Sequence, residues 1–224
     1  MWYPARVSAV GTVAIPFTPL SATYKTLEEI VKQDWRYTYQ LYFRDHANSE
    51  VNIDPQTRRK NIWLMLNGLF RSEAEVAARS GTRQKKGKTN VATGMLDNFR
   101  ELDPSLVWKD CPKVLDYYLT TGMSRGIPFE YYQTRRLNFC EELELLEKGR
   151  GVINKPCFFL GFTKDVVAPK GSPSRVLMNS VVSGTLDTAE VDGTHWALHE
   201  RPEQCAEAIR GWLHKLEQRN GSRL

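Results

Sequence analysis

A continuous apolar segment, residues 155–162, is the feature that most constrains how this chain can fold. It reads Lys-Pro-Cys-Phe-Phe-Leu-Gly-Phe and is followed by Thr-Lys-Asp165. A strand that is apolar at nearly every position, rather than at alternate positions, is typical of a parallel sheet covered on both faces. Open α/β sheets place their chemistry at the carboxyl ends of the strands. The segment therefore predicts an α/β fold with Asp165 at the functional edge of a parallel sheet.

A second strand, predicted for residues 186–191, leads into the loop Asp192-Gly-Thr-His195. Because the carboxyl ends of parallel strands meet at one edge of a sheet, we expect Asp165 and His195 to lie close together. A carboxylate next to an imidazole fixes its tautomer and supports its charge, and histidine titrates near neutral pH. The alternatives are that Asp165 only caps a turn and that His195 is an ordinary loop histidine. Their joint position at strand ends favours an acid–base pair.

The rest of the chain divides into three predicted parts. Residues 1–19 contain a short apolar strand, at 7–15, and lead into a long helical block at 20–150. Residues 151–221 then alternate strand, helix, strand and helix, which predicts a helical lid inserted between strands of a parallel sheet. Helices are predicted at 61–70, 113–120 and 131–146, and a helix followed by a loop at 174–183. A last helix is predicted from Pro202, with Cys205, Ile209, Trp212, Leu213 and Leu216 on one face.

The composition, with 41% hydrophobic and 25% charged residues in 224, is that of an ordinary soluble globular protein. No run approaches the about 18 apolar residues that a membrane span needs, and the first residues do not resemble a secretory signal. The 4 cysteines include no Cys-x-x-Cys pair. Cys157, in the apolar strand, and Cys205, on the last helix, are predicted to be buried thiols rather than halves of disulfides.

The net charge of +5 is concentrated in a basic stretch within residues 71–98. The stretch lacks interleaved aromatic residues, so a solvated loop is favoured over a nucleic-acid contact. The final tripeptide, Ser222-Arg223-Leu224, is similar to the Ser-Lys-Leu peroxisomal address. It predicts a peroxisomal import receptor as a partner, and the cytoplasm is the alternative location.

Several motifs resemble the epoxide-hydrolase branch of the α/β-hydrolase superfamily, over nearly the whole chain. The segments Tyr37-Thr-Tyr-Gln-Leu-Tyr-Phe43 and Gly126-Ile-Pro-Phe-Glu-Tyr-Tyr132 are similar to the two cap-tyrosine motifs of that branch. Tyr3-Pro-Ala-Arg-Val resembles the segment before its sixth strand, and Ala14-Ile-Pro-Phe-Thr-Pro19 resembles the start of its cap. The resemblance implies an α/β-hydrolase fold with a helical cap between parallel strands.

The resemblance also implies the reaction and the roles of individual residues. An aspartate attacks an epoxide carbon, and a histidine then activates the water that hydrolyses the resulting ester to a vicinal diol. By resemblance Asp165 is the acid and His195 the base, while Tyr39 and Tyr132 bind the epoxide oxygen. The family uses no metal and no cofactor, and the aromatic cap suggests an apolar epoxide. The resemblance makes Tyr37 and Gln40 pocket walls or core, and Trp196, next to His195, either a pocket residue or core.

The nucleophile of this reaction is not found in the chain. The family carries it in a Gly-x-Asp-x-Gly elbow that would precede residue 1, so the fold is expected to be incomplete. Gly122-Met-Ser124-Arg-Gly126 matches a serine elbow, but it follows a predicted helix, whereas an elbow must follow a buried strand. The alternatives are an inactive accessory or binding protein, and an esterase-type hydrolase if a missing elbow carries serine.

Overall fold

The structure is a computed structural model, and it describes residues 3–34, 37–45, 117, 120, 129–165 and 167–221. The chain forms two compact units, each described below by itself. One unit combines Met1–Thr23 with Phe139–Leu224, and the other is Tyr24–Asn138. Ser124, the basic stretch at 71–98 and the predicted helix at 61–70 lie outside the described residues, as does the C-terminal tripeptide. The predicted location and import receptor therefore stay predictions.

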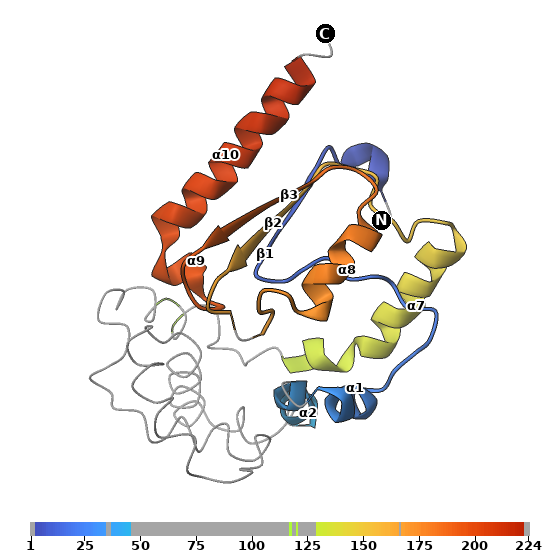
Figure 1. The fold of residues 1–224 in the computed structure, drawn as a ribbon. Helices are drawn as coiled ribbons and strands as arrows, with labels where there is room; N and C mark the ends of the chain where they lie inside the picture. The colour runs from blue at the N-terminus through green and yellow to red at the C-terminus, as the bar shows by residue number, and fades with distance from the viewer. Residues whose placement is uncertain are drawn as a thin grey trace, which may run out of the picture. The chain divides into compact units, whose positions relative to one another are not determined.

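The first unit is built on a sheet of three parallel strands, as the apolar segment predicted (Figure 1). The strands are β1 (Val10–Val13), β2 (Cys157–Phe162) and β3 (Leu186–Val191), and β2 lies in the middle. Cys157 is level with Val10 on one side and with Leu186 on the other. All six residues of β2 are buried. The three carboxyl ends therefore meet at one edge of the sheet.

Helices cover both faces of this sheet, which explains why β2 has no polar side (Figure 1). Phe158, Leu160 and Phe162 pack on one face with residues of α10 (Pro202–Gly221). The alternate residues, Cys157 and Phe159, pack on the other face with α8 (Pro173–Val181). Burying a phenylalanine or leucine side chain contributes about 1.5–3 kcal/mol, so β2 supplies a large part of the stability of this unit.

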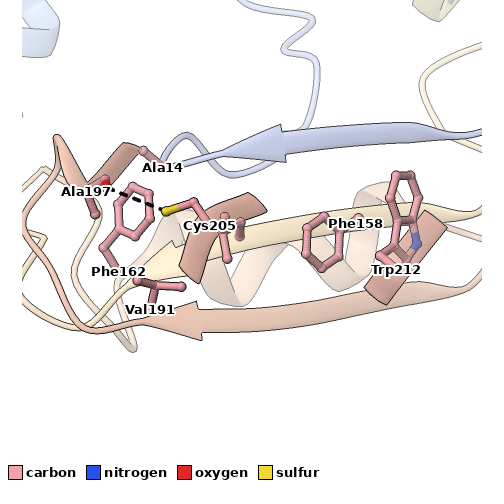
Figure 2. Close-up of a cluster of buried hydrophobic side chains, with 8 residues drawn as sticks. Ala14, Phe158, Phe162, Val191, Ala197, Cys205 and Trp212 are labelled. Carbon is pink, nitrogen blue, oxygen red and sulfur yellow. Dashed lines mark hydrogen bonds between the residues drawn. The ribbon is translucent and has the colours of Figure 1, made fainter. Parts of the chain in front are cut away.

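The cluster of buried side chains between the sheet and α10, which we call the α10 core, contains Phe158, Leu160, Phe162, Cys205 and Trp212. An aromatic stack and a hydrogen bond from a buried thiol hold it together. The rings of Phe158 and Trp212 are stacked with their centroids 5.1 Å apart, and the thiol of Cys205 donates to the carbonyl of Ala197 (Figure 2). Cys157 and Cys205 are both buried and free, as predicted, and burial raises the pKa of each thiol. Leu213 is 46% exposed, so its predicted place on the apolar face is wrong. One residue after Trp212, it is turned about 100° around the helix.

The ends of several elements differ from the predictions. The strand predicted at 7–15 is only β1, because Ala14 has a φ of 64° and turns the chain out of the sheet. The helix predicted at 131–146 is two elements, the 3₁₀ helix η6 (Phe129–Gln133) and α7 (Arg135–Glu147), which begins in the second unit and ends in the first. Short elements also include η1 (Pro4–Arg6) and α9 (Ala197–Glu200).

The described part of the second unit is helical. Helix α1 (Leu27–Gln33) begins at a capping box, in which Thr26 and Glu29 satisfy each other's backbone amides. Arg44, on α2 (Thr38–Asp45), lies 2.6 Å from Glu28 of α1. The Arg44 carbonyl accepts a hydrogen bond from Gln133 of η6, at 3.2 Å. This hydrogen bond joins α2 and η6, the two elements on which the tyrosine motifs lie. Within the described ranges, no helix is long and apolar enough to cross a membrane.

Candidate active site

Asp165 lies three residues beyond the end of β2, in a loop that hydrogen-bonds its carboxylate. The residue is 3% exposed. Its Oδ1 accepts hydrogen bonds from the backbone amides of Val167, at 2.7 Å, and Ala168, at 3.0 Å. An aspartate that binds the amides two and three residues ahead forms a local turn of its own. The chain after β2 therefore fixes the position of a buried carboxylate.

His195 lies four residues beyond the end of β3 and faces that carboxylate. Its Nδ1 is 3.0 Å from each of the two carboxylate oxygens of Asp165, and its side chain is 17% exposed. A carboxylate only accepts hydrogen bonds, so Nδ1 is the donor. The neutral ring then has its acceptor lone pair on Nε2, which is the form that a general base requires. The ring of Trp196 stands edge-on to this imidazole, with the centroids 5.3 Å apart.

The surroundings of Asp165 keep it ionised. Burial by itself raises the pKa of a carboxyl group, but the hydrogen bonds from His195 and from the amides of Ala168 and Val167 outweigh it, so the pKa of Asp165 lies below its ordinary value. An ionised carboxylate at Nδ1 stabilises the imidazolium that forms when Nε2 takes up a proton. The pair is therefore arranged to remove a proton from water.

Hydrogen bonds tie the loop of Asp165 to the loop of His195. The amide of Thr163 donates to the Val191 carbonyl at 3.1 Å, and the amide of Lys164 donates to the Gly193 carbonyl at 3.0 Å. A Cβ atom on Gly193 would stand 2.6 Å from the Cβ of Ala197, closer than such atoms come in real structures. Only glycine fits this turn without a shift of α9.

Glu200 holds the residue that precedes the histidine. Its carboxylate accepts hydrogen bonds from the backbone amide of Thr194, at 2.8 Å, and from the Thr194 hydroxyl. Glu200 was not predicted as a site residue from the sequence, because a glutamate at a helix end is most often solvated. The sequence does contain a signal for this contact. Thr194 and His195 are followed by Glu200, about one turn into the next helical segment.

The remaining predicted site residues lie in or next to helices that the structure describes, and their roles stay predictions. Trp196 is beside His195 in the first unit and partly buried. Tyr37 and Gln40, at the start of α2 in the second unit, are also partly buried. Tyr39 is on α2, and its side chain is outside the described part. Tyr132 is on η6, partly buried, with its ring edge-on to Tyr131 at 5.4 Å. The described residues contain no group of three or more His, Cys, Asp or Glu side chains that could hold a metal ion.

Comparisons with known proteins agree with the class of site that this geometry defines. No family model matches the chain. An epoxide hydrolase of Neurospora crassa, srdG, is 23% identical over 222 residues, which are 96% of this chain and 61% of that protein. Bifunctional epoxide hydrolase 2 of Mus musculus is 24% identical over 219 residues, covering 95% of this chain and 36% of that protein.

Solved structures give the same result for the fold. Epoxide hydrolase A of Mycobacterium thermoresistibile superposes with a TM-score of 0.62 and 24% identity, covering 96% of this chain and 64% of that one. Epoxide hydrolase VrEH1 of Vigna radiata superposes with a TM-score of 0.56 and 17% identity, covering 96% and 63%. The chain therefore has part of the α/β-hydrolase fold and resembles the epoxide-hydrolase branch, as the motifs predicted. It spans less than two thirds of the length of these proteins.

Proposed function

We propose that this chain is the acid–base and cap portion of a hydrolase that adds water to an epoxide and releases a vicinal diol. The observation that carries the proposal is the buried Asp165 carboxylate, with both oxygens 3.0 Å from Nδ1 of His195 at the carboxyl edge of a parallel sheet. The likeness to epoxide hydrolases, over 95–96% of the chain, supports the substrate class. The proposed substrate is an apolar epoxide.

The proposed reaction has two steps. In the first, a carboxylate attacks an epoxide carbon, the ring C–O bond breaks, and an ester forms while the ring oxygen takes a proton from a tyrosine hydroxyl. In the second, Nε2 of His195 accepts a proton from water, and the hydroxide attacks the ester carbonyl. Collapse of that intermediate breaks the ester C–O bond, and the leaving oxygen of the diol takes the proton of the added hydroxyl group, which restores the carboxylate. The proton on Nε2 then returns to the deprotonated tyrosine, and both residues are ready for the next cycle. Asp165 stabilises the imidazolium between these events.

We assign the binding of the epoxide oxygen to Tyr39 and Tyr132. Support comes from the two motifs and from the hydrogen bond between Gln133 and Arg44, which keeps η6 next to α2. Donors that a protein holds in place stabilise a developing alkoxide better than water does, because they need not reorient during the reaction. Tyr37, Gln40 and Trp196 are assigned to the walls of the substrate pocket.

The attacking carboxylate is proposed to lie on a segment outside residues 1–224. Support comes from the chain's coverage of only 61% of the Neurospora relative and 64% of the Mycobacterium structure. Coding sequence upstream of Met1 should contain a strand followed by Gly-x-Asp-x-Gly. A serine in that elbow would indicate an esterase-type hydrolase instead. An upstream sequence without either elbow would favour an accessory or binding protein.

The assay that tests the proposal measures diol formation from an apolar epoxide by the longest product of the gene. His195→Gln should reduce turnover by about 10²–10⁴-fold, the usual contribution of a general base. The matched control is His214→Gln, since His214 is an exposed histidine on α10 whose side chain is 69% accessible. The control should turn over the epoxide at the wild-type rate. If His195→Gln does the same, His195 is not the base of this reaction.

A further inference from the structure

The side chain of Arg175 is a buried cation that the proposed reaction does not use. Arg175 lies on α8, between the buried side of that helix and β2, and is 9% exposed. Burying an unpaired charge is very unfavourable, so the guanidinium must be fully occupied by partners. Its three nitrogens indeed donate to three different groups. Nε donates to the Ala168 carbonyl at 2.7 Å, Nη2 to the Phe162 carbonyl at 3.1 Å, and Nη1 to Glu190 at 2.8 Å.

The two carbonyls lie on either side of Asp165, and each belongs to a residue that also bonds it. Phe162 is the last residue of β2, and its carbonyl accepts the Asp165 amide at 3.4 Å. The amide of Ala168 donates to the Asp165 carboxylate at 3.0 Å. The guanidinium thus spans the acid loop, by which we mean residues 162–165 together with 167 and 168. A change in its position would move both residues that orient the carboxylate.

The sheet is shaped to admit this guanidinium. A Cβ atom on Gly161 would stand 2.8 Å from Nη1 of Arg175, so β2 has a glycine at this position. The guanidinium carbon lies 5.2 Å from the ring centroid of Phe159, within the range of a cation–π contact. A lysine has no planar fork and could not donate to both carbonyls and the carboxylate at these places.

The ion pair with Glu190 does not account for this arrangement. The Glu190 side chain is 29% exposed and also contacts Lys170 at 2.9 Å, so it is a partly solvated surface carboxylate. Glu190 is therefore shared between two cations, and its partial contact with water screens its attraction to the guanidinium. A pair with Glu190 would need only one nitrogen of the guanidinium, whereas the other two are used on the acid loop.

We propose that Arg175 is a positioning residue for the acid–base pair, which fixes the acid loop at both sides of Asp165 and thereby holds the carboxylate opposite His195. The consequence for turnover rests on the proposed function, whereas the consequence for geometry does not. Arg175 contacts none of the reacting atoms and acts through Phe162 and Ala168.

The test begins with NMR spectroscopy of the full chain. The probes are the His195 Nδ1 proton and the exchange rates of the Val167 and Ala168 amides. In Arg175→Lys and Arg175→Met we expect loss of the Nδ1 proton signal. Exchange of the two amides should be about 10–100-fold faster, the factor that corresponds to one hydrogen bond to a charged group.

Glu190→Gln is the matched control, because it removes the charge pair and leaves the two carbonyl contacts. It should keep the Nδ1 signal and the slow exchange. The inference is overturned if the Arg175 variants keep both, or if Glu190→Gln loses both to the same extent. A variant that fails to fold is replaced by a measurement on the unaltered chain. There the Arg175 Nε proton must exchange no faster than the Val167 amide, and faster exchange overturns the inference.

Turnover separates this inference from the proposed function. In the active protein, Arg175→Lys should lower kcat by about 10–100-fold and lower KM with it, so that kcat/KM changes little, because only the pair that hydrolyses the ester after it has formed is disturbed. Loss of the NMR signals without epoxide turnover by any form would refute the proposed function and leave the positioning role. Turnover that depends on His195 but not on Arg175 would support the proposed function and refute the positioning role of Arg175.

Discussion

Replacing Asp165 by asparagine tests the acid–base pair with almost no change of shape. The carboxylate accepts hydrogen bonds from three donors, which are the amides of Val167 and Ala168 and Nδ1 of His195. An asparagine that keeps its oxygen towards the two amides turns its NH₂ group towards the imidazole. Two donors would then face each other, so the ring must move its proton to Nε2. That tautomer cannot act as a base at Nε2.

The expected loss of stability follows from these bonds. Hydrogen bonds to a charged group contribute about 1.5–3 kcal/mol each, compared with about 1 kcal/mol for neutral ones. Three bonds are weakened, while relief from burying a charge offsets part of the loss. We expect the free energy of unfolding to fall by about 2 kcal/mol at neutral pH.

The loss should depend on pH in a defined direction. Because the pKa of Asp165 is lowered in the folded chain, its contribution is present above about pH 4, the ordinary pKa of aspartate. It disappears as the pH falls through the lowered value. The difference between the wild type and Asp165→Asn should therefore be constant near neutral pH and shrink in acid.

Urea unfolding followed by circular dichroism, at neutral pH and at about pH 3, measures both effects. Asp187→Asn is the control, since Asp187 pairs with Arg219 near the other end of β3 at 2.9 Å and that arginine is 43% exposed. The control should lose less than about 1 kcal/mol. If Asp165→Asn loses no more stability than this control, or if its loss does not shrink in acid, the carboxylate does not make the stabilising contribution expected of it.

Three further changes should have distinct effects, each measured by urea unfolding. Glu200→Ala should lower the free energy of unfolding by about 1–3 kcal/mol, because the amide and hydroxyl of Thr194 lose their acceptor; an unchanged value would contradict the role of that contact. Gly193→Ala should destabilise by about 1–3 kcal/mol, since the new Cβ would meet Ala197 at 2.6 Å; a neutral effect would mean that α9 shifts freely. Trp212→Ala should cost about 3–5 kcal/mol, as it empties the α10 core; a loss below about 1 kcal/mol would show that this core is not closely packed.

The sequence predicted the sheet well, because a strand buried on both faces leaves a clear pattern. All the residues of β2 except Gly161 belong alternately to one core cluster or the other, which explains the apolar pattern. The end of β1 was not predictable in the same way. Its last turn depends on a positive φ at Ala14, and alanine carries no signal for that conformation.

The contact between Asp165 and His195 was predicted from the sequence, whereas the residues that hold these two side chains were not. Asp165 and His195 follow strands, and strand ends can be located from hydrophobic patterns. Arg175 and Glu200 bind backbone groups, which every residue has, so their partners leave no trace in the sequence. One signal was available for Arg175. It falls three residues before Met178 on the apolar side of α8, where a cation is unexpected.

Mass spectrometry of the intact His195→Gln protein tests the central claim most directly. With a general base missing, the ester between the nucleophile and the opened epoxide should form but not hydrolyse. The longest product of the gene carrying this change should therefore gain the mass of one epoxide molecule after mixing, while the wild type and His214→Gln return to their original mass. Diol formation by His195→Gln at the wild-type rate, with no added mass, would contradict the account.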